Sequence, residues 1–129
     1  MEQLIRRFYE DLWNRWDNDA IEDLLDEDFV FRGSLGTETR GLAEWRSYRD
    51  TVRAGSADFH NHIVTLLADG DHAAVRLQYT GTHTGPLVGL APTGRRFTYS
   101  GAAFFTGHGG RLTSAWVLGD LTTLHEQLS

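Results

Sequence analysis

Residues 59–80 read FHNHIVTLLADGDHAAVRLQYT, and from Phe59 onward the pattern of the chain is that of β-strands. Two runs rich in apolar and β-branched side chains, Phe59–Ala68 and Ala73–Thr80, flank the segment Asp69-Gly70-Asp71. An Asp-Gly pair between two such runs is typical of a tight hairpin, because glycine adopts positive φ at little steric cost. The stretch therefore predicts two antiparallel strands joined by a short turn.

The chain after this hairpin continues with further strand-like runs. Two of them, near Arg96–Thr106 and Leu112–Leu118, are separated by Gly109-Gly110, which again suits a tight turn. An earlier run, Phe29–Arg32, is short and rich in aromatic and β-branched side chains, so it is predicted to be one more strand. The sequence therefore predicts a mainly antiparallel sheet in the second half of the chain.

Helical spacing replaces the strand pattern in the first part of the chain. Within residues 1–26 apolar side chains recur every three or four positions, which predicts two helices divided near residues 17–19. Asn18 or Asp19 is expected to cap the second helix, because a short side-chain oxygen can accept hydrogen bonds from first-turn amides. Residues 41–54 return to helical spacing and predict a third helix.

The order of these segments indicates one α+β domain over residues 1–129. Helices come first and the meander follows, which favours helices covering one face of a curved antiparallel or mixed sheet. With 129 residues, 40% of them hydrophobic, the chain can bury one core. No repeat or Pro-rich linker divides it.

Composition argues against several classes of partner. The formal net charge of -6 opposes the basic surface that a nucleic-acid-binding protein needs. Apolar stretches are only a few residues long, and the N-terminus lacks an apolar signal core. The chain has no cysteine, which fits a reducing compartment. We therefore expect a cytoplasmic protein with neither nucleic acid nor a membrane as its partner.

Three groups of residues, in order along the chain, carry a resemblance to a known family. They are Asp58–Asn61, the segment Gly81–Gly85 that leads to Gly89–Arg95, and Trp116–Asp120 near the C-terminus. This ordered set resembles the SnoaL-like polyketide cyclases, also called ester cyclases, of the nuclear-transport-factor-two-like superfamily, and the likeness covers nearly the whole chain. The resemblance implies a cone-like fold in which the sheet and the N-terminal helices enclose a pocket for an apolar or aromatic small molecule. It also implies a homodimer packed through sheet faces.

The resemblance further implies a reaction. Cyclases of this family close a ring of a polyketide ester by an intramolecular aldol reaction, without a metal or an organic cofactor. An aspartate on the last strand acts there as acid and base, and Asp120 is the matching position. Because one fold hosts many activities, two alternatives stay open. One is an epoxide or ester hydrolase or isomerase using the same pocket, and the other is a non-catalytic domain that binds a small molecule.

Asp120 needs a particular environment to act as a base. Free aspartate has a pKa near ~3.9, so removal of water around the carboxylate has to raise that pKa. On an extended strand Trp116, Leu118 and Asp120 share one face, and the catalytic hypothesis requires this face to be the pocket wall. The alternative is that Asp120 caps a short helix predicted over residues 121–128.

Five further residues are candidates for contact with a ligand. They are Arg32, Trp45, His60, His83 and Trp116. The guanidinium of Arg32, in an otherwise apolar strand, suits a carboxylate or enolate, or else a salt bridge. The two tryptophans offer flat apolar surface, which is equally typical of a core. The two histidines can donate to a carbonyl oxygen or serve purely structural roles.

Histidine spacing bears on a metal site and on the reaction. His60 and His62 alternate and so face the same side of a strand, but no third ligand stands at a supporting interval, so no metal site is expected.

In the family's cyclases a histidine on the penultimate strand assists the aspartate. Counting back from Asp120 places Thr106 near that position, while His108 belongs to the predicted turn. The chain departs from the family pattern here.

Overall fold

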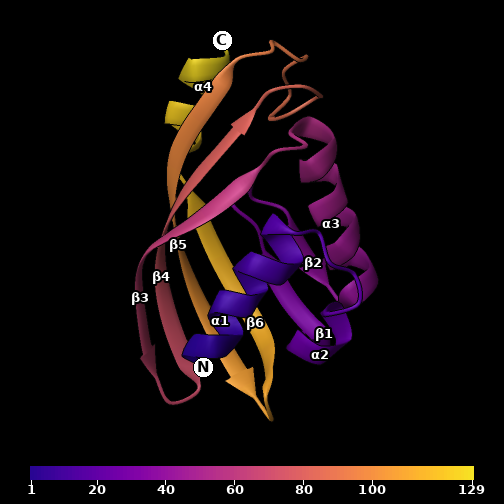
Figure 1. Cartoon of the computed structure of the whole chain (residues 1–129), viewed down its shortest axis with the longest axis vertical. Coiled ribbons are helices and arrows are strands. Elements are labelled where there is room, and N and C mark those ends of the chain that lie inside the picture. The colour runs from indigo at the N-terminus through magenta and orange to yellow at the C-terminus, as the bar shows by residue number, and fades with distance from the viewer.

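One curved sheet of six strands organises the molecule. A computed structural model describes all residues, 1–129, and places the strands in the order β2-β1-β6-β5-β4-β3 (Figure 1). Four long strands form an antiparallel meander: β3 (His60–Asp69), β4 (His72–Thr82), β5 (Arg96–His108) and β6 (Arg111–Gly119). The predicted meander is confirmed, and both glycine-containing turns fall where the sequence places them.

The first strands complete the sheet at its other end. Strand β1 (Leu25–Arg32) pairs parallel with β6, and β2 (Glu38–Arg40) pairs antiparallel with β1. The sheet is therefore mixed. Sequence patterning finds the second half of β1 but misses β2, because a three-residue strand with exposed residues at both ends has too little apolar alternation to detect.

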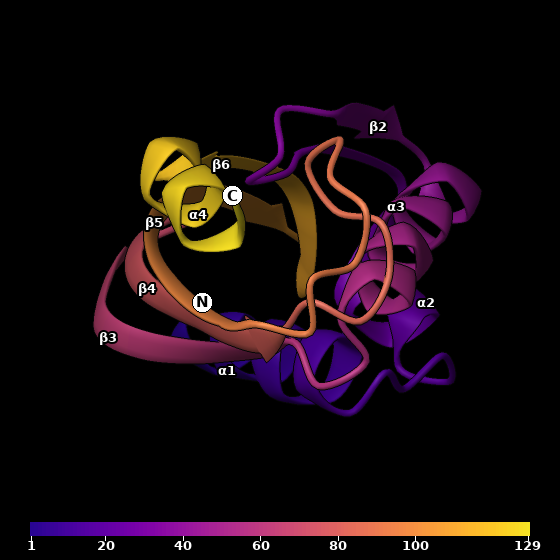
Figure 2. The ribbon, with the colours of Figure 1, turned by 90° about the horizontal axis from the view of Figure 1, so that it is seen from above.

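Helices cover the concave side and one end of the sheet. Helix α1 (Glu2–Arg7) continues without a break into the π-helical segment η1 (Phe8–Asn14). Helix α3 (Leu42–Gly55) follows β2, and α4 (Leu121–Leu128) follows β6. Figure 2 shows the sheet strongly curled, with α1 along the side of β3 and β4, α3 on the side away from β5, and α4 next to β5 where the chain terminates. None of these helices combines the length and the apolar character needed to cross a membrane.

The second predicted helix is much shorter than the sequence suggests. Helix α2 covers only Ile21–Leu24, and its N-cap residue is Ala20, which makes no side-chain capping bond. The prediction of Asn18 or Asp19 as the cap is wrong. The oxygen of Asn18 instead accepts a hydrogen bond from the guanidinium of Arg49, so a tertiary contact uses the group that the helix was expected to use.

The core lies inside the curl of the sheet. Buried side chains alternate along β4 as Val75, Leu77 and Tyr79, and the matching positions of β5 are also buried. This alternation follows from the period of two along a strand. At the upper part of the curl Tyr79 and Tyr99 are cross-strand partners, with ring centroids 4.7 Å apart. Aromatic rings from η1 and α3 fill the remaining interior, and they form the walls of the site described next.

Candidate functional site

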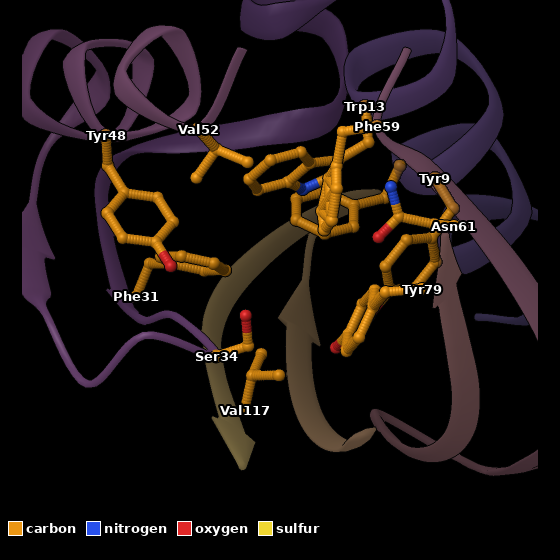
Figure 3. Close-up of a pocket in the computed structure, with 11 residues that line it drawn as sticks. Tyr9, Trp13, Phe31, Ser34, Tyr48, Val52, Phe59, Asn61, Tyr79 and Val117 are labelled. Atoms are coloured by element: carbon orange, nitrogen blue, oxygen red, sulfur yellow. The ribbon is translucent and has the colours of Figure 1, made fainter. Parts of the chain in front are cut away.

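A cavity opens inside the curl of the sheet, between η1, α3 and the inner strand faces (Figure 3). The cavity volume is about 20 Å³, and the wider hollow, which is open to solvent, measures about 310 Å³. All lining residues except Ser34 and Asn61 carry apolar or aromatic side chains. The eleven lining residues are Phe8, Tyr9, Trp13, Phe31, Ser34, Tyr48, Val52, Phe59, Asn61, Tyr79 and Val117. An interior site of this make-up suits a small apolar ligand with a few polar groups.

Aromatic rings control how large a ligand can enter. The ring of Trp13 lies edge-on to Tyr48 and Phe59, with centroids 6.2 and 6.1 Å away, and Phe59 stacks on Tyr79 at 5.6 Å. The cavity volume holds about one water molecule. A ring-bearing ligand therefore fits only if these side chains rotate, because the space between them is smaller than an aromatic ring.

Hydroxyl groups gather at the end of the pocket near β6. The Ser34 hydroxyl lies 3.2 Å from the Tyr99 hydroxyl, and the backbone amide of Leu35 donates to the Tyr48 hydroxyl at 3.3 Å. Gly33 makes this arrangement possible, since a Cβ at that position would lie 2.2 Å from the Tyr48 hydroxyl. In the loop after β1, Gly33 thus lets the backbone approach the Tyr48 ring, while Ser34 and Leu35 provide hydrogen-bond partners for the tyrosine hydroxyls.

The tyrosines of the site stay protonated over the physiological pH range. Burial raises the pKa of Tyr9, Tyr48, Tyr79 and Tyr99, because a phenolate is poorly solvated among aromatic rings. For Tyr79 the neighbouring tyrosines raise the pKa further. The hydroxyls of Tyr9, Tyr48 and Tyr79, which line the pocket, are therefore neutral hydrogen-bond donors suited to a carbonyl or enolate oxygen. Tyr99 bonds to Ser34 and does not line the pocket.

Asn61 contributes the amide side chain of the pocket, and hydrogen bonds to Asn14 fix its position. Its backbone N–H donates to Asn14 Oδ1 at 2.8 Å and its Nδ2 donates to the same oxygen at 3.2 Å. In return Asn14 Nδ2 donates to the Asn61 carbonyl at 3.0 Å. Since the amide nitrogen faces Asn14, the amide oxygen points toward the centre of the pocket in Figure 3.

Asp120 lies outside this pocket. It is exposed at the N-terminus of α4, where Oδ1 accepts from the Thr123 amide at 3.1 Å and Oδ2 from the Thr123 hydroxyl at 2.6 Å. The side-chain hydrogen bond from Thr123, followed by the backbone one, lowers the pKa of Asp120. The capping arrangement weakens the carboxylate as a base, whereas a catalytic base needs its pKa raised.

The strand face that carries Asp120 is the outer face of the sheet. Trp116 and Leu118 are 45% and 53% exposed, whereas Ala115 and Val117 point inward. The prediction that Trp116, Leu118 and Asp120 form the pocket wall is therefore wrong. Small inward residues on β6 leave room for the rings that η1 and α3 contribute, so the bulky side chains of this strand face outward.

Arg32 and Trp116 meet on the same outer face. The guanidinium of Arg32 donates to the Val117 carbonyl at 2.6 Å and lies 5.2 Å from the centre of the Trp116 ring. Neither residue lines the pocket. Phe104, 56% exposed on β5, pairs across the strands with Trp116 at 6.1 Å. These side chains belong to an apolar surface of the sheet.

The other three candidates also lie away from the pocket. Trp45 belongs to α3 and is completely buried in the protein core. His60 is exposed at the start of β3, on the same side of the strand as His62. His83 is buried in the loop after β4, where its Nδ1 accepts from the Thr93 amide at 3.2 Å. No three His, Asp or Glu side chains come together as a possible metal site.

Sequence reasoning missed five polar residues of the pocket, namely Tyr9, Ser34, Tyr48, Asn61 and Tyr79. A signal existed for Asn61: it alternates with His60 and His62, so outward histidines imply an inward asparagine. The inward hydroxyls of Tyr9 and Tyr79 carry no comparable signal, because buried tyrosine is common in ordinary cores.

Comparison with known proteins places the chain among small α+β proteins. A family model described as SnoaL-like polyketide cyclase matches residues 3–128. Among solved structures, the candidate polyketide cyclase IdmH from Streptomyces antibioticus is 25% identical, with a TM-score of 0.85, over 98% of this chain and 96% of that one. TsrD from Streptomyces laurentii is 25% identical, with a TM-score of 0.87, over 99% and 93% of the two chains.

A third structure supports the fold alone. A candidate SnoaL-like polyketide cyclase from Jannaschia sp. CCS1 is 18% identical, with a TM-score of 0.90, over 99% of this chain and 90% of that one. A search of curated proteins finds no match.

Proposed function

Since the chain belongs to the SnoaL-like polyketide cyclase family, we propose that its interior pocket holds an apolar carbonyl compound of the polyketide type and promotes an intramolecular aldol ring closure without a cofactor. The observation that carries the proposal is the pocket itself. Its walls are aromatic, and its polar groups are tyrosine and serine hydroxyls and one amide. Such a lining places a flat apolar body against rings and a carbonyl oxygen against neutral donors.

Ring closure requires two proton movements. A base removes the proton from a carbon flanked by two carbonyls, and the resulting enolate carbon attacks a second carbonyl of the same molecule. The alkoxide formed then takes up a proton, so the atoms of the substrate are conserved. Neutral tyrosine hydroxyls stabilise the negative oxygen in both steps, because they donate hydrogen bonds where the charge develops.

Asp120 is the proposed base, and it acts by leaving its capping position. Gly119, the preceding residue, lies against Ser34 and Tyr99, so the carboxylate is one residue from the hydroxyl end of the pocket. Release from Thr123 removes the hydrogen bonds that lower its pKa. In this proposal Asp120 has two conformations: the capping one described above, and a catalytic one in which the end of β6 turns the carboxylate from the outer face toward the pocket.

Asp120→Asn separates these two roles. Asparagine is as good an N-cap as aspartate, so the free energy of unfolding should change by no more than about 0.5 kcal/mol. Loss of the base should lower turnover about 10²- to 10⁴-fold. Initial rates on a confirmed substrate and urea unfolding measure the two effects. Wild-type turnover by this variant would reduce Asp120 to a structural cap.

Thr123→Val is the matched variant that keeps the carboxylate. It removes the side-chain hydrogen bond that contributes most to lowering the pKa of Asp120. The folded pKa of Asp120 should rise toward its ordinary value, and the acidic limb of the pH–rate profile should move to higher pH. A limb that stays in place argues that another group is the base.

Product mass distinguishes ring closure from the hydrolytic alternative. Incubation of the protein with a 1,3-dicarbonyl ester that bears a further ketone should give a cyclic isomer of unchanged mass, or that isomer less one water. An epoxide or ester hydrolase adds water, and in H₂¹⁸O the product gains the heavy isotope. Incorporation of ¹⁸O from water into a hydrolysed product therefore contradicts the ring-closure proposal.

A second candidate function is non-catalytic binding of the same class of ligand. It is favoured by one observation: no carboxylate or imidazole lines the pocket, and Asp120 is a cap with a lowered pKa. A binding domain should retain its ligand unchanged, and Asp120→Asn should retain wild-type affinity. Mass spectrometry of the compound that copurifies with the protein identifies the ligand in either case.

We also propose a homodimer formed through the outer sheet face. Phe104, Trp116 and Leu118 are each about half exposed on adjacent strands, which makes a continuous apolar surface of the kind that marks interfaces. Trp116→Glu places a charge at its centre and should convert a dimer into a monomer by sedimentation velocity. Ser47→Glu, on the exposed side of α3, is the control and should leave the dimer intact. A wild-type monomer at high protein concentration contradicts this assembly.

A further inference from the structure

The hydroxyl of Tyr9 is a buried donor without a partner. Tyr9 is 3% exposed and lines the pocket, and its hydroxyl makes no hydrogen bond to the rest of the protein. Buried polar groups in native proteins are nearly always satisfied, so an unpaired hydroxyl inside a pocket points to a group that arrives from outside. Tyr48 and Tyr99, by contrast, have partners in the Leu35 amide and the Ser34 hydroxyl.

The orientation of Tyr9 is fixed by its surroundings. Its ring packs edge-to-face against Phe8 at 5.1 Å and against Phe105 at 6.0 Å. Its backbone belongs to η1, the π-helical segment that also carries Trp13 into the pocket wall. π-helical turns occur frequently at functional sites, because they re-aim side chains that a regular helix would place elsewhere. The donor is therefore held in place before any ligand binds.

Asn61 presents the complementary group in the same pocket. Its amide nitrogen is engaged by Asn14, which leaves the amide oxygen as an acceptor directed into the cavity (Figure 3). Because Asn14 also accepts from the backbone amide of Asn61 and donates to its carbonyl, three hydrogen bonds to this one residue fix Asn61. Asn14 is thus a positioning residue for the acceptor.

We propose that Tyr9 and Asn61 are the specificity-determining pair of the pocket, with Tyr9 donating to a carbonyl oxygen of the ligand and Asn61 accepting from a hydroxyl or N–H of the same ligand. The inference rests on the ligand-binding part of the proposed function and not on ring closure. It selects neutral ketones or esters that also carry a hydrogen-bond donor, such as hydroxyketones or enolised dicarbonyls.

The same pair selects against carboxylic acids. No lysine, arginine or histidine lines the cavity, so an entering carboxylate would lose its water without gaining a positive partner. An ester keeps the carbonyl acceptor and lacks the charge. Neutral recognition of this kind explains why the polar contacts of the pocket come from hydroxyl and amide groups.

Three probes with one carbon skeleton test the assignment. Ethylbenzene has no polar group, acetophenone has an acceptor, and 1-phenylethanol has a donor and an acceptor. Dissociation constants follow from quenching of tryptophan fluorescence, since Trp13 lines the cavity. Tyr9→Phe should weaken acetophenone about 3- to 10-fold, the range expected for one neutral hydrogen bond, and leave ethylbenzene unchanged. Asn61→Leu should weaken 1-phenylethanol more than acetophenone.

Tyr99→Phe is the matched control for loss of a buried hydroxyl. Tyr99 bonds to Ser34 and does not line the cavity, so this variant should leave the probe affinities unchanged and lower Tm by a few degrees. Tyr9→Phe should keep or raise Tm, because it removes an unpaired donor. Benzoate should bind the wild-type protein more weakly than acetophenone.

Two results would overturn the assignment. An unchanged ratio of acetophenone to ethylbenzene affinity in Tyr9→Phe means that this hydroxyl does not contact the ligand. A drop in Tm as large as that of Tyr99→Phe means that the hydroxyl serves the fold. If no probe binds the wild-type protein, the pocket-binding proposal fails together with this one. If probes bind as expected but no dicarbonyl ester is converted, only the ring-closure proposal fails.

Discussion

Replacing Phe8 by alanine is expected to lower the free energy of unfolding by about 3–5 kcal/mol. Phe8 is completely buried and lies at the centre of the aromatic core, with ring centroids of Phe105 and Trp45 at 5.4 and 5.8 Å. Alanine removes the ring and leaves a cavity that neighbouring aromatic side chains cannot fill without leaving their own contacts. Since small domains are stable by about 5–15 kcal/mol, this loss is a large fraction of the total.

Urea unfolding followed by tryptophan fluorescence measures the effect. Phe8→Leu is the matched variant, because it retains most of the side-chain volume, and it should cost about 1–2 kcal/mol. Both variants lose the aromatic ring, but only Phe8→Ala leaves a large cavity. The difference between their free energies of unfolding therefore measures the cost of the cavity. A stability of Phe8→Ala within about 1 kcal/mol of the wild type would contradict the view that η1, α3 and the sheet share one core.

Replacing Arg49 by alanine is expected to cost about 2–4 kcal/mol. Arg49 is 1% exposed and packs over the Trp45 ring at 5.4 Å. Its Nη1 donates to the Leu12 carbonyl at 3.2 Å, and its Nη2 donates to the side-chain oxygen of Asn18. The substitution leaves the Leu12 carbonyl, near the end of η1, without this hydrogen bond. It also removes the bond that ties Asn18, in the segment between η1 and α2, to α3.

Hydrogen exchange adds a local measurement to this prediction. Amides of residues 8–18 should exchange faster in Arg49→Ala than amides of the central strands, because the lost bonds hold that segment. Arg53→Ala is the control on the same helix: Arg53 lies over the Trp16 ring at 5.1 Å but is exposed, so the change should stay within about 0.5 kcal/mol. Equal losses for the two arginines would contradict a special role for the buried one.

Strand periodicity predicted the sheet well, because a period of two leaves a strong signal. Val75, Leu77 and Tyr79 alternate with polar residues along β4, and Gly70 supplies the positive φ of the turn that precedes it. Turn residues and the alternation of buried and exposed side chains depend only on positions a few residues apart. The sequence alone therefore predicts the meander and its hairpins.

Periodicity did not reveal which face of β6 points inward. Both faces of this strand carry apolar residues: Ala115 and Val117 on one, Trp116 and Leu118 on the other. Larger residues suggest the interior, yet here the interior is already filled by rings from η1 and α3. The inward face depends on η1 and α3, which lie far earlier in the sequence, so the pattern of β6 alone predicts the wrong side of the strand for the site.

The parallel pairing of β1 with β6 has a consequence for folding during synthesis. The two strands are joined by the bond from Arg32 to Val117, across 85 positions of sequence. Phe31 and Val117 on these strands form part of the same pocket wall, so the wall cannot close until the last strand has emerged. Contacts between such distant segments slow folding, because a long loop must be ordered before they form. Until then β1 keeps one hydrogen-bonding edge open, and an unpaired edge of this kind can pair with another chain and favour aggregation.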